Sequence, residues 1–363
     1  MQWAIGHLDA DRSQPVATDT IYRISSMTKP ITASAALVLV DDGVVALDDP
    51  VDDLLPELAE RRVLSHPAAR VDDTVPAVRP ITIEDLLMFR LGLGGDFADF
   101  RPKPIDDAIA ALDLAAGPPQ PALPPEPGEW MRRLGTVPLQ YQPGERWLYH
   151  TGADVLGVLV ARAAGQPLGE FLAERLFAPL GMTDTGFFVP AHERHRFGAC
   201  FGADPESGER YEYDPRDGQW SRPPAFPGGG AGLVSTVGDY HRFADALCNG
   251  GSSHGTRVLS EASVRAMTRN QLTDEQLSRG GPDPAGGIGW GFGVGVQLRA
   301  DGPLSVGSYG WDGGLGSIWR TDPEHDLVGI LLTNQTWTSP TPPPVCATFW
   351  SAVRAVGRSG RAL

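Results

Sequence analysis

The most chemically suggestive run in the chain is Ser26-Met27-Thr28-Lys29, in which a hydroxyl and an amine are three residues apart. A helix is predicted from Ser26 to Asp42, with Ser25 as its N-cap. Residues three apart on a helix share a face, so the Ser26 hydroxyl and the Lys29 amine can meet in one site. Because a free serine hydroxyl is a poor nucleophile, a neighbouring amine and the dipole of the first helical turn would both help it. The spacing therefore predicts nucleophilic catalysis by Ser26, whereas the plain structural interpretation is a capped helix with a solvated lysine.

Two further runs can complete such a site. Tyr149-His150-Thr151 lies directly before a predicted helix, for which Thr151 and Asp154 form a capping-box pattern. A tyrosine at that junction can serve as general acid or base, although it can also be a packing aromatic. The run Gly310-Trp311-Asp312-Gly313-Gly314 lies in the strand-rich C-terminal part. Glycines at a strand edge let a substrate approach the backbone, whose N–H groups can form half of an oxyanion hole; the alternative is a turn between strands.

The order and context of these three elements resemble the serine β-lactamase and penicillin-binding-protein superfamily, and most closely its class C β-lactamase-like esterases, the family VIII carboxylesterases. That family has S-x-x-K at a helix start, Y-x-N before a helix and K-T-G or a variant on a late strand. In this chain Ser26–Lys29, Tyr149–Thr151 and Trp311–Gly313 occupy those places. The stretches Ile81–Leu87, Gln142–Gly144 and Gly230–Thr236 also look familial, so the resemblance covers nearly the whole chain.

The resemblance implies a role for each of these residues. It implies an acyl-enzyme on Ser26, with Lys29 and Tyr149 sharing the proton transfers, and an oxyanion hole made by the backbone N–H groups of Ser26 and Gly314. Which of the two is the base stays open. No metal or organic cofactor is implied. The residues implied to contact the substrate are Thr151, Trp311, Asp312 and Gly313.

The chain departs from the family pattern at three places. Thr151 stands where β-lactamases have Asn, so a hydroxyl replaces an amide, or the residue is only an N-cap. Trp311 stands where they have Lys or His, which removes a cation that would meet a substrate carboxylate. The chain also begins at what looks like the second strand of the family, which implies either a shortened sheet edge or a start site farther upstream.

These features together predict a serine hydrolase that cleaves short-chain carboxylic esters. One alternative is a β-lactamase or D,D-peptidase that uses the same residues. A second alternative, from a different class, is a non-catalytic penicillin-recognising protein, against which the intact Ser26, Lys29 and Tyr149 set argues.

The pattern of elements predicts an α/β (α+β) fold with an antiparallel sheet flanked by helices and an inserted all-helical region, and the resemblance implies that this fold is of the β-lactamase/transpeptidase type. Residues 1–45 and 225–363 are expected to form the sheet domain and residues 46–224 a mostly helical one, with the site between them. The Pro-rich segment from Gly117 to Gly128 is expected to be irregular. Strands are predicted at Trp3–Asp9, Ile21–Ser25, Trp290–Leu298, Leu304–Ser308, Ser317–Thr321 and Leu327–Thr333. Helices are predicted after Thr82, where Asp85 completes a capping box, and at Leu168–Phe177, Val237–Leu247 and Val345–Val356.

Composition narrows the classes of partner. The 363 residues include 45 acidic and 30 basic side chains, which give a net charge of −15. This field repels polyanions, so nucleic-acid binding is not expected. The resemblance implies a small-molecule ester or β-lactam-like substrate instead. The start of the chain lacks the basic and apolar regions of a signal peptide, and the longest apolar stretch, Ala33–Val40, is too short to span a bilayer. A cytoplasmic protein without membrane association is therefore expected, while its oligomeric state stays open.

Other motifs carry less weight. Gly251-Ser252-Ser253-His254-Gly255 matches G-x-S-x-G, but that motif needs a strand–turn–helix context and a helix precedes it here. His192 and His195 are three apart without an evident third ligand, so no metal site is expected. A disulfide framework is not indicated, because the three cysteines are far apart and odd in number. They are Cys200, Cys248 and Cys346.

Overall fold

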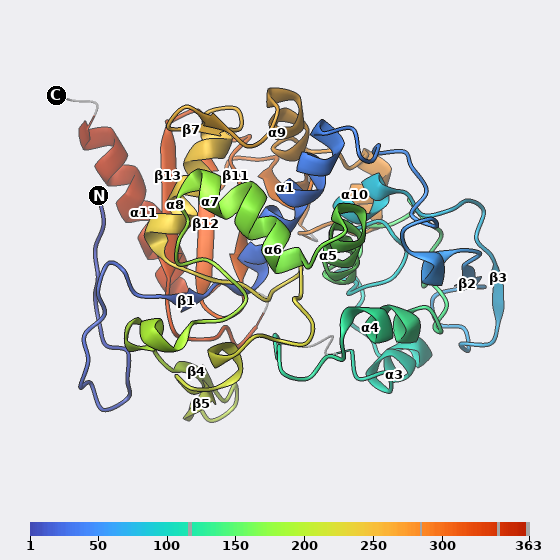
Figure 1. The fold of residues 1–363 in the computed structure, drawn as a ribbon, viewed down its shortest axis with the longest axis horizontal. Helices are drawn as coiled ribbons and strands as arrows, with labels where there is room; N and C mark the ends of the chain where they lie inside the picture. Colours follow the sequence, from blue (N-terminus) through green and yellow to red (C-terminus); the bar gives the residue numbers. More distant parts are fainter. Residues whose placement is uncertain (115–117, 284, 340–341, 361–363) are drawn as a thin grey trace.

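The protein is an α+β structure in which one antiparallel sheet lies beside a mostly helical region (Figure 1). The computed structural model describes residues 1–114, 118–283, 285–339 and 342–360. In Figure 1 the strands β11, β12 and β13 lie on the side of both chain termini, the helices α3 and α4 lie on the opposite side, and α1 lies between. The predicted fold class is confirmed.

The sheet has five antiparallel strands in the order β13-β12-β11-β10-β9. Their bounds are β9 Ile288–Trp290, β10 Gly295–Gln297, β11 Tyr309–Gly313, β12 Ser317–Asp322 and β13 Leu327–Leu332. The predicted meander is confirmed, with two corrections. The strand predicted at Trp290–Leu298 is divided by a turn, since Gly291 N bonds to Val294 O and Gly293 has φ +74°. The strand predicted at Leu304–Ser308 is a loop, and the strand begins at Tyr309.

The N-terminal segment gives no strand to this sheet. The strand predicted at Trp3–Asp9 is reduced to one isolated bridge between His7 and Pro15. The strand predicted at Ile21–Ser25 is β1, Tyr22–Arg23, which pairs with β6, Val234–Ser235, in a separate two-stranded sheet. The remaining two-stranded sheets pair β2 Arg62–Leu64 with β3 Thr74–Pro76, β4 Cys200–Ala203 with β5 Arg210–Asp214, and β7 Ser252–Ser253 with β8 Thr256–Arg257.

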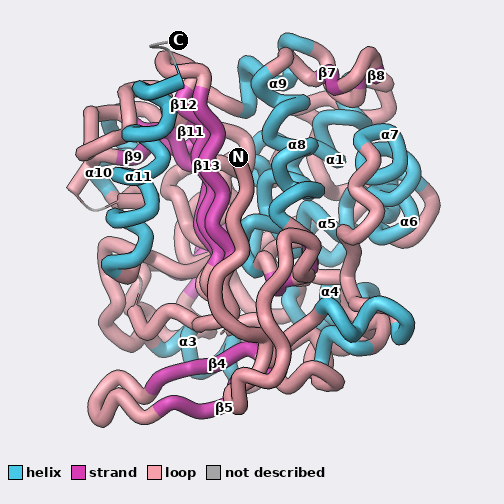
Figure 2. Tube along the Cα trace, turned by 90° about the vertical axis from the view of Figure 1, so that its left-hand side faces the viewer, coloured by secondary structure: helices cyan, strands magenta, loops and turns pink. Residues whose placement is uncertain are grey.

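Helices cover both faces of the sheet. The helix α11, Pro344–Gly360, and the helix α8, Val237–Cys248, both pack on β13, and Figure 2 shows them on opposite sides of the strands. The other helices are α1 Thr28–Asp41, α2 Ile83–Leu87, α3 Pro104–Ala110, α4 Pro127–Leu134, α5 Thr151–Ala164, α6 Leu168–Leu172, α7 Ala178–Leu180, α9 Glu261–Met267 and α10 Asp274–Arg279. The Pro-rich segment is loop from residue 118 until α4 begins, and Gly117 lies outside the described residues.

The helix α1 is buried from Thr28 to Leu39 and packs on α5. Small and apolar residues occupy all of its sides, as in helices that cross the interior of a protein. A lysine in its first turn is therefore carried into the core: Lys29 is 1% exposed. The position of α1 thus places the one basic side chain of this helix away from bulk water.

Of the helix caps predicted from the sequence, one is present in the structure and two are not. The capping box of Thr82 and Asp85 is confirmed, with both reciprocal hydrogen bonds present. Ser25 is not an N-cap: it has φ +46° and opens a 3₁₀ turn, Ser25–Met27, that leads into α1 without a side-chain cap. The predicted capping box of Thr151 and Asp154 is wrong as well, because His150 is the residue before α5 and Asp154 bonds elsewhere.

Candidate active site

Ser26 lies at the junction of α1 and the central sheet. The residue before it, Ser25, has the left-handed φ of +46°, a strained conformation that persists where the surroundings enforce it. The 3₁₀ turn of Ser26 packs against β11 and β12, and Ser317 Oγ at the start of β12 donates to Ile24 O at 2.8 Å. Ser26 is buried on this turn, with 8% of the residue exposed.

Lys29 lies beside the serine, as the spacing predicts for two residues on one helical face. Its Nζ is 3.1 Å from Ser26 Oγ and donates to Gly230 O at 2.7 Å. Burial disfavours the ammonium form and lowers the pKa of Lys29 to about 7, although the nearby Asp154 carboxylate acts in the opposite direction. At neutral pH a large fraction of this amine is thus free to accept a proton.

Tyr149 approaches the same lysine from the start of α5. Lys29 Nζ lies 4.5 Å from the centroid of its ring, and Trp311 Nε1 donates to its hydroxyl at 2.8 Å. Burial raises the pKa of Tyr149 to about 12, while the Ser26 hydroxyl and the Trp311 indole act in the opposite direction. The phenol therefore keeps its proton at neutral pH and suits the role of an acid.

An aromatic wall surrounds Tyr149. Its ring lies 4.9 Å from that of Phe97, 5.6 Å from that of Trp147 and 5.8 Å from that of Trp311, measured between centroids. Trp311 also meets Trp290 edge to face at 4.7 Å. This wall displaces water from Tyr149 and Lys29 and lowers the local dielectric, which strengthens the charge interactions in the site.

The sequence interpretation missed two residues, His150 and Asp154. His150 Nδ1 lies 3.1 Å from Lys29 Nζ, and His150 Nε2 lies 3.0 Å from Asp154 Oδ2. Asp154 Oδ1 accepts from Gly230 N at 2.8 Å. The one signal in the sequence was the i,i+4 spacing of a histidine and an aspartate at a helix start, which the capping-box interpretation of Asp154 concealed.

The backbone beside Ser26 supplies two free donors. A Cβ at Gly313 would lie 2.3 Å from Ile24 O and 2.2 Å from Ser317 Oγ, so only glycine lets β11 approach the serine turn this closely. In the described part of the chain, neither the Ser26 N–H nor the Gly314 N–H has a hydrogen-bond acceptor. These two groups lie at the contact between the end of β11 and the 3₁₀ turn of Ser26.

Three of the residues that the resemblance implies for substrate contact have their own partners or positions in the structure. Asp312 follows Trp311 on β11 and so faces the opposite side of the sheet, where its carboxylate binds the Arg320 guanidinium through two hydrogen bonds. Thr151 begins α5, and within the described ranges its hydroxyl makes no hydrogen bond to Lys29. The indole N–H of Trp311, a residue implied to contact the substrate, donates to the Tyr149 hydroxyl.

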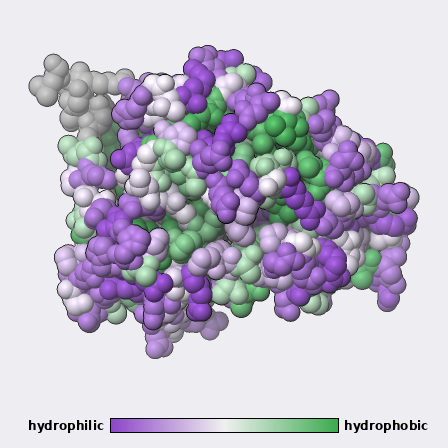
Figure 3. All heavy atoms as spheres, viewed as in Figure 1, coloured by the Kyte–Doolittle hydropathy of each residue, from purple (hydrophilic) through white to green (hydrophobic). Residues whose placement is uncertain are grey.

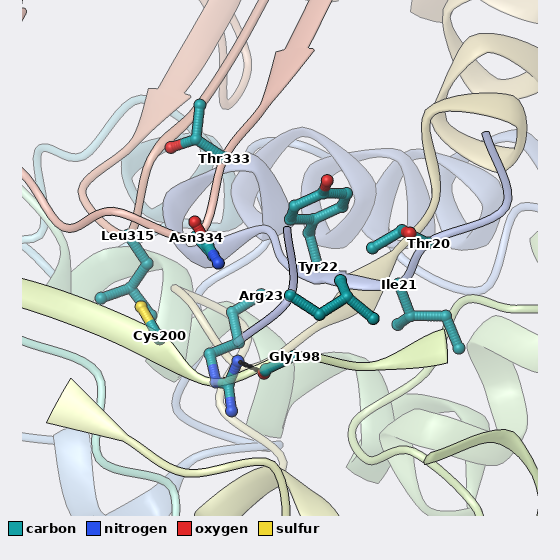
Figure 4. A pocket seen from close by; sticks show the side chains of 10 residues that line it. Thr20, Ile21, Tyr22, Arg23, Gly198, Cys200, Leu315, Thr333 and Asn334 are labelled. Carbon is teal, nitrogen blue, oxygen red and sulfur yellow. Dashed lines mark hydrogen bonds between the residues drawn. The ribbon is translucent and has the colours of Figure 1, made fainter. Parts of the chain in front are cut away.

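A pocket of about 410 Å³ adjoins the histidine–aspartate side of this cluster. His150 and Asp154 form its polar wall, and its other lining residues include Leu114, Pro119 and Phe226. A smaller pocket of about 240 Å³ lies behind β1 and includes Tyr22, Arg23 and Cys200 in its lining (Figure 4). Arg23 is held there by Asp214 and by Gly198 O, and none of Ser26, Lys29 and Tyr149 lines this pocket.

The remaining motifs do not form competing sites. Ser253 Oγ donates to Asp245 Oδ2 at 3.1 Å in a short hairpin, not at a strand–turn–helix junction. Within the residues described, no group of three or more His, Cys, Asp and Glu side chains is arranged to hold a metal ion. No single described helix has the length and apolar character to cross a membrane. Only α5 and the Leu168–Leu180 segment taken together have that length and composition among the described residues, and they are bent by 80° relative to each other.

Comparison with known proteins agrees with this geometry. The family model described as Beta-lactamase matches residues 1–343. Protein Rv1367c of Mycobacterium tuberculosis (strain ATCC 25618 / H37Rv) is 40% identical over 297 residues, covering 82% of this chain and 71% of that protein. Esterase EstB of Burkholderia gladioli is 32% identical over 321 residues, covering 79% and 76%. The solved structure of EstCE1, titled a hydrolase with promiscuous acyltransferase activity, superposes with a TM-score of 0.76 over 96% of this chain and 88% of that one, at 23% identity.

Proposed function

The chain belongs to the beta-lactamase family, and from that premise we propose that it is a serine hydrolase that cleaves short-chain carboxylic esters through an acyl-enzyme on Ser26. The observation that carries the proposal is the 3.1 Å contact between Ser26 Oγ and Lys29 Nζ at a buried site. A nucleophile paired with a base of suitable pKa is the minimal apparatus of acyl transfer. The substrate is a small molecule.

Lys29 is the base of the first step. Its pKa of about 7 allows it to accept the Ser26 proton at neutral pH, whereas Tyr149, with a pKa of about 12, is already protonated. As the Ser26 oxygen bonds to the ester carbon, its proton moves to Lys29 Nζ and the carbonyl electrons move onto the carbonyl oxygen. The N–H groups of Ser26 and Gly314 are proposed to hold that oxyanion.

Tyr149 is the proposed acid for the leaving alcohol. When the tetrahedral intermediate collapses, the departing alkoxide takes the phenol proton. The Trp311 N–H, which donates to Tyr149 Oη at 2.8 Å, stabilises the phenolate that results. Lys29 then returns its proton to Tyr149, and water, deprotonated in the same way, releases the acid and restores Ser26.

Trp311 favours an ester over a β-lactam or a D-alanyl peptide. Those substrates carry a carboxylate, and Trp311 stands where the family pattern has a lysine or histidine. Its N–H is occupied by Tyr149, so the residue offers the substrate an apolar ring only. A β-lactamase or D,D-peptidase with the same catalytic residues remains the alternative, and the relatives include esterase EstB.

Replacement of the nucleophile tests the proposal. Ser26→Ala is expected to abolish turnover of p-nitrophenyl butyrate and to leave the melting temperature nearly unchanged, because the truncated group packs little. A matched control is Ser253→Ala, the serine of the G-x-S-x-G run, which should keep wild-type turnover. A fluorophosphonate adduct should map to Ser26 by peptide mass spectrometry. An adduct on Ser253, or full activity in Ser26→Ala, would remove the basis of the proposal.

A further inference from the structure

We propose that His150 and Asp154 form a positioning dyad that aims the Lys29 amine at Ser26, an inference that rests on the proposed hydrolase function. Four contacts define the dyad. Lys29 Nζ lies 3.1 Å from His150 Nδ1, and His150 Nε2 lies 3.0 Å from Asp154 Oδ2. Gly230 joins both ends, since its carbonyl accepts from Lys29 at 2.7 Å and its N–H donates to Asp154 Oδ1 at 2.8 Å.

The carboxylate fixes the tautomer of the imidazole. A carboxylate oxygen only accepts, so the His150 nitrogen facing Asp154, Nε2, carries the proton. His150 Nδ1 then presents a lone pair to Lys29. The same logic holds wherever a carboxylate orients a functional histidine: it selects which nitrogen donates and holds the ring in place.

This tautomer determines the direction of the amine. A neutral Lys29 has two N–H bonds and one lone pair. The two N–H bonds point to Gly230 O and His150 Nδ1, so the lone pair is left for the third neighbour, Ser26 Oγ. After Lys29 has taken the Ser26 proton, the ammonium has three N–H bonds and three acceptors around it. The dyad thus offers an acceptor to Lys29 in both protonation states of the amine.

The backbone at His150 is strained in a way that serves this contact. His150 has φ +80° and ψ −64°, and Thr151 N donates to Tyr149 O at 3.1 Å, which makes a γ-turn of the rare, strained type. Successive side chains of a strand point to opposite faces. At this turn, however, both the Tyr149 ring and the His150 ring meet Lys29. The strain brings an acid and a positioning group to one amine.

The dyad packs closely against Gly230, where a side chain would not fit without displacing it. A Cβ there would lie 2.9 Å from Asp154 Oδ1 and 3.1 Å from His150 Nε2.

Thr151 stands where the family pattern has Asn, and its hydroxyl has no described bond to Lys29. In this chain the neighbouring residue, His150, contacts Lys29. Among the described residues, the charged or titratable groups in contact with His150 are Lys29 from α1, Tyr149, and Asp154 from α5. The segments 119–124 and 226–232 complete the pocket wall with Pro, Gln, Phe, Gly and Ala side chains, none of which is ionisable.

Asp154→Asn is the first test. The amide can keep its oxygen on Gly230 N, and its NH₂ then faces His150 Nε2. The imidazole should change to the Nδ1–H tautomer, which turns a donor toward Lys29. We expect kcat for p-nitrophenyl butyrate to fall at least ~10-fold with KM within about twofold, the scale on which a misdirected proton-transfer group acts. Loss of the carboxylate, which favours the ammonium, should also move the rising limb of the pH–rate profile to lower pH.

The tautomer is measured by ¹⁵N–¹H correlation NMR of the protein without substrate, with the His150 signals assigned by their absence in His150→Asn. Asp107→Asn, an exposed first-turn aspartate of α3, is the matched control and should leave kcat and the spectrum unchanged. A wild-type Nδ1–H tautomer, or an Asp154→Asn variant with wild-type kcat, would overturn the proposal.

A pair of substitutions at His150 separates positioning from packing. The oxygen of His150→Asn can accept from Lys29, and Asn tolerates the positive φ; His150→Leu has a similar shape but no acceptor. Asn should retain kcat within about tenfold of wild type, and Leu should lose at least ~10²-fold, with melting temperatures compared for both. Equal kcat values in folded Asn and Leu variants would contradict the dyad. Because the tautomer is read without turnover, these results stay separate from the Ser26→Ala test: an active Ser26→Ala would defeat the hydrolase proposal alone.

Discussion

In the proposed mechanism, Lys29 determines the pH range in which the enzyme is active. The side chain is 1% exposed, and burial holds its pKa near 7 although the ordinary value is 10.5. An amine that titrates near neutral pH is far more effective as a base than an ordinary surface lysine. The cost is a buried nitrogen that must have a partner in each protonation state, and Ser26, His150 and Gly230 O supply those partners.

The pH dependence follows from the two proton-transfer groups. Below pH 7 Lys29 is mostly protonated and cannot act as base, so kcat/KM for p-nitrophenyl butyrate should rise about tenfold per pH unit there and level off above pH 7. Tyr149 stays protonated up to a pH of about 12, so no fall should appear between pH 7.5 and 9.5. Initial rates from pH 5 to 9.5, corrected for spontaneous hydrolysis, measure this. A kcat/KM that stays low at pH 7 and is still rising steeply at pH 9.5 would show that the base is not a Lys29 with a lowered pKa.

At the scale of elements, the site depends on how closely β11 approaches the 3₁₀ turn before α1. Gly313 is the residue at closest approach, where a Cβ would overlap Ile24 O and Ser317 Oγ. The next residue, Gly314, has no atom within 4 Å of an added Cβ. Two adjacent glycines therefore meet opposite steric conditions, although they are alike in sequence.

This difference predicts opposite outcomes for one substitution. Gly313→Ala should lower the free energy of unfolding by about 1–3 kcal/mol, the usual cost of overpacking, because β11 and the turn must separate. Gly314→Ala should change the free energy of unfolding by less than about 0.5 kcal/mol. Urea denaturation of both variants at one pH provides the comparison. Similar losses of stability in the two variants would mean that the close approach of β11 to the serine turn does not limit packing.

At the scale of the whole molecule, charge and the aromatic wall act in the same direction. The net charge of −15 lowers the local concentration of anions, and hydrophilic residues cover much of the face seen in Figure 3. Trp311, 8% exposed, gives the site an indole where the family pattern has a cation. Both features disfavour a substrate with a carboxylate.

Substrate preference and its salt dependence test this combination. We expect kcat/KM for p-nitrophenyl butyrate to exceed that for benzylpenicillin by at least ~10²-fold, equivalent to about 3 kcal/mol of transition-state discrimination. Raising the ionic strength from ~0.01 to ~0.2 M should increase the benzylpenicillin value and leave the ester value nearly constant, because salt screens only the charged substrate. Both constants are measured at each ionic strength. A preference for benzylpenicillin would favour the β-lactamase alternative.

Local spacing in the sequence was sufficient to predict part of this structure. The contact between Ser26 and Lys29 depends on helical periodicity alone, the capping box at Thr82 on three neighbouring residues, and the strands β12 and β13 on runs of apolar and β-branched residues between turn residues. The family resemblance and the α+β class followed from the order of such local signals along the chain. In each case the deciding interaction joins residues close together in sequence.

The other contacts of the candidate site were decided by the tertiary structure alone, because the residues that form them are far apart in sequence. His150 meets Lys29 across 121 positions, and Trp311 meets Tyr149 across 162. The strained γ-turn at His150 directs its side chain toward Lys29. Asp154 accepts a hydrogen bond from Gly230 N and does not form the capping box that its spacing predicted. The pKa of Lys29 likewise depends on burial by elements from the whole chain. Sequence spacing shows which groups can meet within one helix, whereas only packing shows which distant group occupies the remaining side of a buried amine.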